Sequence, residues 1–264
     1  MIFDRFLSAF SIVSRIPVKI KFNFDPSRMD FYLPIIGIFP ALLGLILSGL
    51  YIISVNFIGE HIVLAVIIIM IIQYLCFNLF HLDGLMDTAD AFLGSVNKEK
   101  RQEILKDSRI GVYGFFAGFA VLALKAALLI PLFKFIQNSA GVIFLYPLIG
   151  RFSAALIPCI VPAANSKGLG VLAKDSKVYR CIFGIITSCI LWGLITARLW
   201  NGSLVHLVIP AVSLVIIAPL TAVFYARLYK RGIGGYTGDT LGAAIETGEL
   251  LSLAAAFVFL NLPV

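Results

Sequence analysis

The sequence is poor in charged residues. Only 13% of its 264 residues are charged and 60% are hydrophobic, against about 25% and about 45–50% in typical soluble domains. This shortage excludes a disordered chain, a nucleic-acid-binding module and an ordinary soluble enzyme. Together with a mean hydropathy of +1.00, the composition predicts an integral membrane protein that contacts the lipid bilayer and no nucleic acid.

Cysteine is also scarce, and it follows no pattern. Cys76, Cys159, Cys181 and Cys189 all lie in apolar runs and form no Cys-x-x-Cys motif. Isolated thiols of this kind are typical of buried free cysteines, so neither a disulfide framework nor a zinc site is predicted. The sequence also lacks internal repeats, low-complexity segments and linkers, and we therefore expect a single domain over residues 1–264.

The first residues lack the features of a secretory signal peptide. Asp4, Arg5 and Arg15 interrupt the apolar residues, and no clear cleavage site follows them. We expect residues 1–30 to form an amphipathic lead-in on the cytoplasmic side of the membrane.

What the sequence does contain is a series of long apolar runs. A helix needs about 20 apolar residues to cross a hydrocarbon core of roughly 30 Å. The seven runs cover residues 33–57, 62–80, 113–136, 142–161, 181–200, 205–226 and 249–262. The last run is short, so six spans plus a partial one are the alternative. The predicted fold is an all-α, polytopic membrane bundle of about seven transmembrane helices.

The basic residues lie almost entirely on one side of these runs. If all seven runs span, 17 of the 21 Lys and Arg fall in the N-terminal segment and in the loops 81–112, 162–180 and 227–248. Cytoplasmic loops carry such an excess, so we expect this side to be cytoplasmic, and the net charge of +7 to reflect membrane topology. Because only Glu60 among the acids lies on the opposite face, we expect loops 81–112 and 227–248 to form a cytoplasmic active site.

Three aspartates follow the second apolar run. Asp83, Asp87 and Asp90 are spaced i, i+4 and i+7, which places them on one stripe of a helix. Like charges repel each other there, and the cost rises near a membrane. A divalent cation removes this repulsion, and ligands that are all oxygen favour Mg²⁺. A solvated helix start is the alternative, but it explains one or two acids better than three.

A glycine-rich segment follows the sixth run. Residues 231–246 read Arg-Gly-Ile-Gly-Gly-Tyr-Thr-Gly-Asp-Thr-Leu-Gly-Ala-Ala-Ile-Glu, and the glycines allow backbone amides to turn toward an anion. The segment is not a Walker loop, because no Gly-Lys-Ser/Thr follows. Asp239 and Glu246 repeat the i, i+7 spacing, which predicts a second acidic stripe facing the first. A merely flexible loop is the alternative.

Several cations lie between the two acidic segments. Lys106 and Arg109 flank Asp107, and Arg151 lies inside the fourth run. An arginine can hold phosphate oxygens in a bidentate fork, but Arg109 also fits a positive-inside anchor and Arg151 an ion pair with an acid. His81 is a candidate base or ligand, or else a structural histidine. Carboxylates, cations and a glycine loop on one membrane face favour Mg²⁺-dependent phosphoryl or nucleotidyl transfer.

Three segments occur in an order that is typical of one known family. They are His81-Leu82-Asp83-Gly84-Leu85 with Asp87-Thr88-Ala89-Asp90, then Lys106-Asp107-Ser108-Arg109-Ile110-Gly111, then Gly235-Tyr236-Thr237-Gly238-Asp239-Thr240-Leu241-Gly242-Ala243. With Arg15-Ile16-Pro17-Val18 and Gly168-Leu169-Gly170, they resemble the cobalamin synthase family, the adenosylcobinamide-GDP ribazoletransferases. Two positions depart from the family pattern: Ala91 replaces a glycine, and Lys167 stands near the place of an arginine.

The resemblance implies a Mg²⁺-dependent transferase of a prokaryotic cytoplasmic (inner) membrane. Its substrates would be adenosylcobinamide-GDP and α-ribazole or its 5′-phosphate, and its products GMP and adenosylcobalamin or its 5′-phosphate. The implied metal ligands are Asp83, Asp87, Asp90 and Asp239, and the catalytic candidates are Asp83, Asp90, Asp239 and His81. The candidates for binding substrate phosphates are Lys106, Asp107, Arg109, Arg151, Lys167, Tyr236 and Thr237. Whether the chain forms a homo-oligomer stays open.

Other classes share part of this pattern. The acidic helix is similar to the Asp-Gly helix of CDP-alcohol phosphatidyltransferases, but Met86-Asp87 stands where that family has Ala-Arg. A cation-coupled transporter also carries membrane acids, but transporter sites lie near the midplane and often accompany inverted repeats. A non-catalytic scaffold leaves the acidic stripe unexplained.

Overall fold

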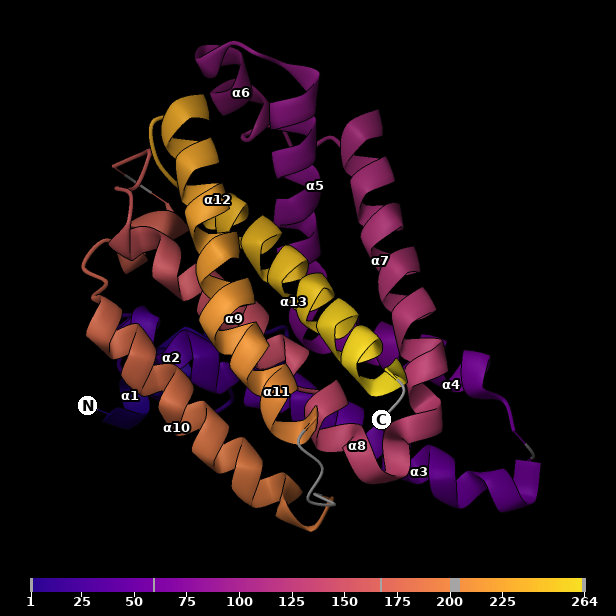
Figure 1. Cartoon of the computed structure of the whole chain (residues 1–264). Helices are drawn as coiled ribbons and strands as arrows, with labels where there is room; N and C mark the ends of the chain where they lie inside the picture. Colours follow the sequence, from indigo (N-terminus) through magenta and orange to yellow (C-terminus); the bar gives the residue numbers. More distant parts are fainter. Residues whose placement is uncertain (1, 59, 167, 200–204, 263–264) are drawn as a thin grey trace.

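The structure is a computed structural model that describes residues 2–58, 60–166, 168–199 and 205–262. These residues form helices joined by connections, of which residues 14–28 are the longest described, and the β-bridge recorded among them pairs Ala163 with Tyr236. The predicted all-α class is therefore confirmed. Figure 1 shows α5, α7, α12 and α13 forming one side of a bundle, with α10 crossing at the other.

The α-helices are α1 (Ile2–Val13), α2 (Met29–Ile36), α3 (Ile38–Ile58), α4 (Ile62–Gln73), α5 (Leu79–Gly94), α6 (Lys98–Ile104), α7 (Val112–Leu132), α8 (Ile136–Ile143), α9 (Tyr146–Leu156), α10 (Val178–Thr196), α11 (Val205–Val212), α12 (Ala218–Gly232) and α13 (Gly238–Asn261). The π-helical segments η1 (Tyr74–Asn78) and η6 (Ser213–Ile217) continue α4 into α5 and α11 into α12. The 3₁₀ segments are η2 (Phe133–Phe135), η3 (Ile157–Cys159), η4 (Leu169–Ala173) and η5 (Ala197–Leu199).

Six helical stretches are long and apolar enough to cross a membrane, which agrees with the prediction of about seven spans. The difference arises at the predicted runs 113–136 and 142–161, which lie in one continuous stretch, Val112–Cys159. Within this stretch the chain reverses direction, since α7 and α9 are joined through η2 and α8 (Figure 1). The two predicted runs thus correspond to separate helices, α7 and α9, which are joined by η2 and α8 and not by a loop.

The predicted loops 81–112 and 227–248 are partly helical. Helix α5 continues beyond the apolar run to Gly94, and only residues 233–237 separate α12 from α13. Helix α13 begins early because Thr237 caps it. The Thr237 hydroxyl accepts the Thr240 N–H, and the Thr240 hydroxyl accepts the Thr237 N–H, so two otherwise unpaired donors are satisfied. The predicted run 249–262 is therefore the second half of a 24-residue helix.

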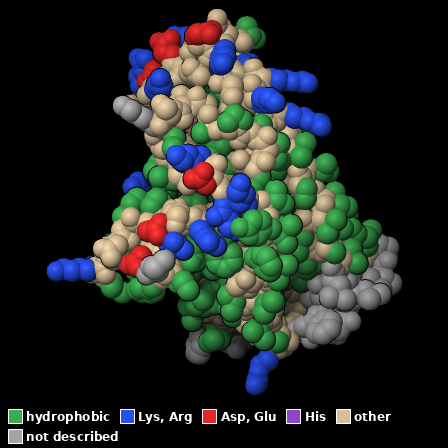
Figure 2. All heavy atoms as spheres, turned by 90° about the vertical axis from the view of Figure 1, so that its left-hand side faces the viewer, with side chains coloured by type: hydrophobic (Ala, Val, Ile, Leu, Met, Phe, Trp, Pro, Cys, Tyr) green, Lys and Arg blue, Asp and Glu red, His purple; other side chains and the backbone are tan. Residues whose placement is uncertain are grey.

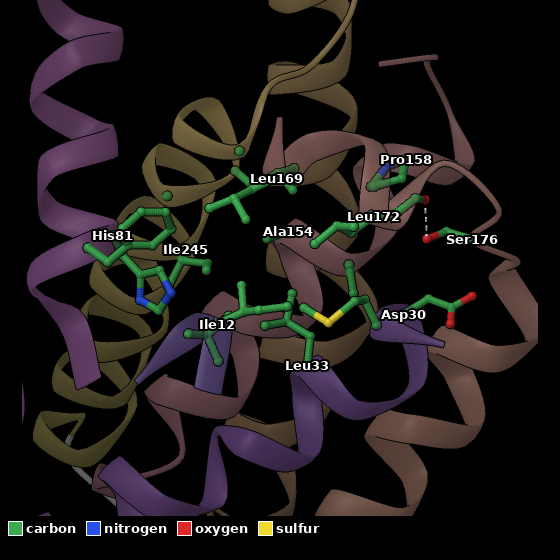
Figure 3. Close-up of a pocket in the computed structure, with 18 residues that line it drawn as sticks. Ile12, Asp30, Leu33, His81, Ala154, Pro158, Leu169, Leu172, Ser176 and Ile245 are labelled. Atoms are coloured by element: carbon green, nitrogen blue, oxygen red, sulfur yellow. Dashed lines mark hydrogen bonds between the residues drawn. The ribbon is translucent and has the colours of Figure 1, made fainter. Parts of the chain in front are cut away.

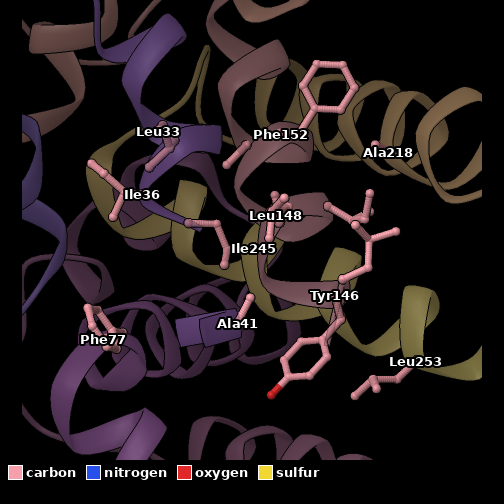
Figure 4. Packing of buried hydrophobic residues seen from close by; sticks show 14 of the residues in the cluster. Leu33, Ile36, Ala41, Phe77, Tyr146, Leu148, Phe152, Ala218, Ile245 and Leu253 are labelled. Atoms are coloured by element: carbon pink, nitrogen blue, oxygen red, sulfur yellow. The ribbon is translucent and has the colours of Figure 1, made fainter. Parts of the chain in front are cut away.

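Helix α9 lies at the centre of the hydrophobic core. Its residues from Tyr146 to Ala155 are all buried. Figure 4 shows Leu148 of α9 among Leu33 of α2 and Ile245 of α13. In contrast to this buried helix, α7 has exposed apolar side chains, Phe115 and Phe119, on its outer face, as contact with lipid requires. Apolar side chains thus fill the interior and also cover the outside of the bundle.

Charged side chains gather on one part of the surface. Figure 2 shows Lys, Arg, Asp and Glu at the top and across the middle of the molecule, whereas the lowest part is mostly hydrophobic. We call the region formed by residues 83–109, 162–177 and 230–239 the polar end. Its three segments are linked, because the Gln102 amide donates to the Ile233 carbonyl at 3.0 Å and Tyr236 pairs with residues 162–164.

Candidate functional site

The two acidic segments meet where α5 packs against α13. Gly84 of α5 lies against the backbone carbonyl of Asp239, and a Cβ at Gly84 would overlap it. Gly242 of α13 lies against the backbone of His81, where a Cβ would be 2.7 Å from the carbonyl oxygen. One glycine on each helix therefore permits this close approach, and the approach brings Asp83 and Asp239 together.

Four aspartates form a group of like charges at this contact. We call Asp83, Asp87, Asp90 and Asp239 the aspartate cluster. Asp87 is repelled by the other three, and Asp239 is repelled by Asp83. None of the four forms an ion pair with any Lys or Arg that the structure describes. The cluster thus carries an uncompensated negative charge that a bound cation would stabilise.

The aspartate cluster is not arranged as a finished metal site. Over the described ranges, no three His, Cys, Asp or Glu side chains converge closely enough to hold a metal ion by themselves. Mg²⁺ does not require such a cage, since it usually takes one or two carboxylates and completes its shell with water and substrate phosphate oxygens. The oxygen-only donor set therefore fits Mg²⁺ bound together with a substrate.

Asp90 also holds α7 in place. Its two carboxylate oxygens accept the N–H groups of Gly111 and Gly114 at 2.7 and 2.8 Å, at the N-terminus of α7. A negative charge is favourable at that end of a helix, and a Cβ on either glycine would collide with the carboxylate. By contrast, Asp83 is exposed, so its oxygens are freer to meet a ligand than those of Asp90.

A polar pocket of about 600 Å³ opens beside Asp239. Lys106, Tyr236 and Thr237 contribute to its lining, so we call it the Lys106 pocket. Tyr236 is 1% exposed, and its hydroxyl has no hydrogen-bond partner among the described atoms. Burial raises the pKa of Tyr236 to about 12, so the hydroxyl stays protonated at neutral pH. The pocket therefore contains one cation and one unused buried donor, which suits an anionic group.

The loop after α9 builds the wall of this pocket. The Ala164 N–H donates to the Tyr236 carbonyl at 2.8 Å, and the Tyr236 N–H donates to the Pro162 carbonyl at 3.1 Å. Gly170 lies against the backbone of Thr237, just before α13 begins. Lys167, a predicted phosphate ligand in the same loop, lies outside the residues that the structure describes.

A second polar pocket, of about 890 Å³, reaches Asp83. Arg15 and Ser14 line it, and the Arg15 N–H donates to the Cys76 carbonyl at 2.8 Å, which fixes the segment beside η1. We call it the Arg15 pocket. No binding role is predicted for Arg15 from the sequence, although Arg15 belongs to one of the segments that carry the family resemblance. That segment was the signal that could have identified it.

Arg109 and Asp107 bind each other at the surface. The Arg109 Nε lies 2.9 Å from one Asp107 oxygen, and its terminal nitrogen lies 2.6 Å from the other. These hydrogen bonds lower the pKa of Asp107 to about 2. The Arg109 side chain is 87% exposed, and neither residue lines the Lys106 or the Arg15 pocket. Of the three predicted phosphate-binding candidates Lys106, Asp107 and Arg109, only Lys106 lines one of these two pockets.

Arg151 and Glu246 lie in the bundle interior, away from these pockets. Arg151 is fully buried and donates to Glu249 at 2.9 Å and to Asn78 at 3.1 Å. The structure thus pairs Arg151 with an acid, the alternative left open by the sequence, and does not bring it to either polar pocket. The predicted second acidic stripe is wrong, because Glu246 is fully buried and accepts a hydrogen bond from Lys125 at 2.7 Å.

These residues form a charge-balanced group, which we call the buried network. It consists of two cations and two anions, Lys125, Arg151, Glu246 and Glu249, each at most 2% exposed. Lys125 lies 2.7 Å from both glutamates, and the Asn78 amide donates to both of them. The π-helical segment η1 ends at Asn78, so this irregular turn helps to aim a polar side chain inward.

His81 is buried without a hydrogen-bond partner. The residue is 2% exposed, and neither ring nitrogen has a partner in the described part of the chain. The ring lines a third, largely apolar pocket of about 600 Å³, shown in Figure 3. His81, the predicted catalytic histidine, is therefore close to Asp83 in the sequence, but its ring lines this third pocket and neither of the two polar pockets.

These features define a polytopic helical membrane protein with an aspartate cluster and two polar pockets at one end. The model of the cobalamin-5-phosphate synthase family matches residues 5–257. The chain belongs to this family.

Curated relatives match over nearly their whole length. A protein of Shewanella amazonensis is 33% identical over 253 residues, which cover 94% of this chain and 92% of the relative. A protein of Thermosipho melanesiensis is 32% identical over 98% of this chain and 100% of its own length. Both are named adenosylcobinamide-GDP ribazoletransferase. No solved structure is a significant match to the chain.

Proposed function

We propose that this chain transfers the adenosylcobinamide-phosphate moiety of adenosylcobinamide-GDP to α-ribazole or its 5′-phosphate and releases GMP. Its family and the names of its relatives support this function. The structural observation that carries the proposal is the uncompensated aspartate cluster between two pockets that contain Lys106 and Arg15. Pyrophosphate oxygens need cations and donors, which these pockets supply, and a cation held by the cluster adds to them.

The transfer is a substitution at phosphorus. A hydroxyl oxygen of the ribazole forms a bond to the phosphorus that bears cobinamide, and the bond from this phosphorus to the bridging oxygen breaks. GMP leaves with the bridging oxygen and its electron pair. The hydroxyl proton passes to a carboxylate of the aspartate cluster. Asp83 is the candidate base, because it is exposed at the Arg15 pocket.

We propose Mg²⁺ as the cofactor, held by one or two of the carboxylates of Asp83, Asp87 and Asp239 together with phosphate oxygens of the substrate. These three carboxylates repel one another and have no paired cation among the described residues. When bound, the ion would neutralise charge on the pyrophosphate and on the leaving phosphate. Asp90 would support the site from the N-terminus of α7, where its oxygens already accept two N–H groups.

The Lys106 pocket would bind and orient the phosphates. Lys106 supplies a positive charge, and the protonated Tyr236 hydroxyl supplies a donor that has no other described partner. The N-terminus of α13 lies at the same pocket through Gly238, and helix N-termini favour anions. Because Thr237 is already fixed in the capping box, its role is to shape this helix end.

We place the site on the cytoplasmic face of a prokaryotic inner membrane. The clustering of basic residues in the segments of the polar end supports this orientation. A Ser108→Cys variant in inverted and right-side-out vesicles tests it with a membrane-impermeant thiol reagent. Labelling of inverted vesicles alone is expected, and labelling of right-side-out vesicles alone would reverse the assigned orientation.

The function is tested by GMP release from purified protein with both substrates and Mg²⁺. Wild type is expected to release GMP, and Asp83→Asn and Asp239→Asn are expected to release almost none while they insert normally. Asp175→Asn is the matched control, because Asp175 is an exposed acid in the same polar end. A transporter or scaffold would release no GMP, and full activity of Asp83→Asn would remove Asp83 from the site.

A further inference from the structure

The third pocket, which we call the His81 pocket, has a composition unlike that of the two polar pockets. Its side chains come mainly from α1, α2, α5, α9, η3, η4 and α13, and most of them are apolar. Figure 3 shows Leu169, Leu172 and Ala154 around its centre, with His81 at one end and Asp30 at the other. An apolar hollow with few polar groups at its ends is typical of small-molecule sites.

The polar side chains at the Asp30 end already have partners. The Asp30 carboxylate accepts the Lys177 N–H at 2.7 Å and pairs with Arg180 at 2.9 Å. The Ser176 hydroxyl donates to the Ala173 carbonyl at 2.7 Å. Within the described lining, His81 is thus the residue whose buried polar side-chain atoms are unsatisfied. Buried polar atoms normally have hydrogen-bond partners. The His81 ring is therefore the place in this pocket where a polar group of a ligand would find a partner.

The His81 pocket adjoins the site proposed above. It shares Ile12, Val13 and Phe80 with the Arg15 pocket, which reaches Asp83. It shares Leu169 and Gly238 with the Lys106 pocket, which reaches Asp239. A group bound in the apolar pocket is therefore a neighbour of both polar pockets beside the aspartate cluster.

We infer that the His81 pocket binds the benzimidazole base of the ribazole acceptor, with the His81 ring donating a hydrogen bond to the free ring nitrogen of that base. This inference rests on the proposed function. A neutral imidazole has one N–H donor, and a benzimidazole joined to ribose through one nitrogen keeps one acceptor on an otherwise apolar ring. The imidazole N–H and the free ring nitrogen of the base therefore form a complementary donor and acceptor pair.

Other groups of the two substrates fit this pocket less well. Guanine has donors and acceptors along several edges, and most of them would lose their partners in an apolar lining with one free imidazole. The corrin carries many peripheral amides, which have the same disadvantage. A lipid acyl chain would fill the apolar volume but would leave His81 without a partner. The benzimidazole base fits the apolar lining and offers an acceptor to the imidazole N–H of His81.

Binding of α-ribazole to the purified full-length protein, measured by calorimetry without the second substrate, tests this inference. The probe pair is α-ribazole and its indole analogue, in which a C–H group replaces the free ring nitrogen. Wild type is expected to bind the indole analogue about tenfold more weakly, as for one lost hydrogen bond. In His81→Phe, binding of α-ribazole is expected to fall to the level of the indole analogue, so that the preference disappears.

Matched variants separate this effect from a general loss of structure. His61→Phe changes an exposed histidine and is expected to keep the tenfold preference. Leu172→Phe adds volume inside the pocket and is expected to weaken both ligands equally. The KM for adenosylcobinamide-GDP should stay unchanged in His81→Phe, because the nucleotide-activated substrate does not use this pocket.

Two results would overturn the inference. One is equal binding of α-ribazole and its indole analogue to wild type, and the other is an unchanged preference in His81→Phe. Either result can occur while GMP is still released, in which case the proposed function survives alone. Conversely, a His81-dependent preference in a protein that releases no GMP would keep the base-binding pocket and refute the proposed transfer.

Discussion

Helix α13 carries carboxylates in two different settings. Asp239 at its start belongs to the aspartate cluster, which has no ion pair among the described residues, whereas Glu246 and Glu249 are paired with Lys125 and Arg151. The second group is fully buried and neutral as a whole, and the first is partly exposed and negative. The counter-charges therefore distinguish the group proposed to bind a cation from the group that pairs within the bundle.

The largest effect on activity is expected at the aspartate cluster. Asp87→Asn removes one charge from the site, and we expect a loss of turnover of about 10³-fold, or roughly 4 kcal/mol of barrier. The thermal midpoint should stay constant or rise, because the substitution also removes repulsion from the other aspartates. GMP release and thermal unfolding in detergent measure the two effects. Normal turnover with a lower midpoint would assign Asp87 to the structural group.

The largest effect on stability is expected in the buried network. Lys125→Met leaves two buried glutamates with one cation, and breaking a buried pair in this way costs about 3–5 kcal/mol. The yield of folded protein and the thermal midpoint are the measurements. Lys134→Met is the control, because Lys134 is exposed and its loss should change the midpoint little. Equal midpoints for the two variants would contradict a structural role for the network.

A double variant sharpens this test. Lys125→Met with Glu246→Gln removes one charge of each sign and leaves the pair between Arg151 and Glu249, which are 2.9 Å apart. We expect the double variant to be about 1–3 kcal/mol more stable than Lys125→Met alone, because residues of one network do not act additively. Strictly additive losses would show that charge balance does not determine the stability of this region.

The contact between α5 and α13 is expected to have an intermediate effect. Gly84→Ala places a methyl group against the Asp239 carbonyl, and overpacking of this kind costs about 1–3 kcal/mol. Turnover should fall further than the midpoint predicts, because the aspartates move apart. Gly193→Ala is the matched control in open space on α10, and it should raise helix stability slightly. Identical kinetics for the two variants would argue against the contact.

The smallest effect is expected at the surface pair of Asp107 and Arg109. The pKa of Asp107 is lowered to about 2, so the pair contributes above the ordinary pKa of 3.8 and is lost only as the pH falls toward 2. Wild type and Asp107→Asn should therefore have parallel midpoints between about pH 5 and 8. A difference that appears near neutral pH would show that another titrating group depends on this pair.

Much of the comparison between the two carboxylate groups could be predicted from sequence. The i, i+4, i+7 spacing of Asp83, Asp87 and Asp90 identified the first cluster because helical geometry is regular over such short distances. The family resemblance placed Asp239 in the same group, and α5 and α13 do meet there.

The rest depends on contacts between distant segments, which local spacing does not contain. Glu246 follows Asp239 by two turns but pairs with Lys125, which is 121 residues earlier in the chain. Arg151 likewise pairs with Glu249, which is distant from it in the sequence. Charged residues within apolar runs are a general indication of interior partners, and Lys125 showed this signal without revealing which acid it meets. The apolar pocket at His81 is lined by residues of seven helical elements, which local spacing does not bring together.

The continuity of α13 has a consequence for protein engineering. Asp239 and Glu249 belong to one uninterrupted helix, so a shift of this helix that widens the acceptor site would also separate Glu249 from Arg151. Attempts to change the base that the proposed site accepts should therefore leave α13 alone and vary η4, where Leu169 is exposed and Leu172 is half-buried.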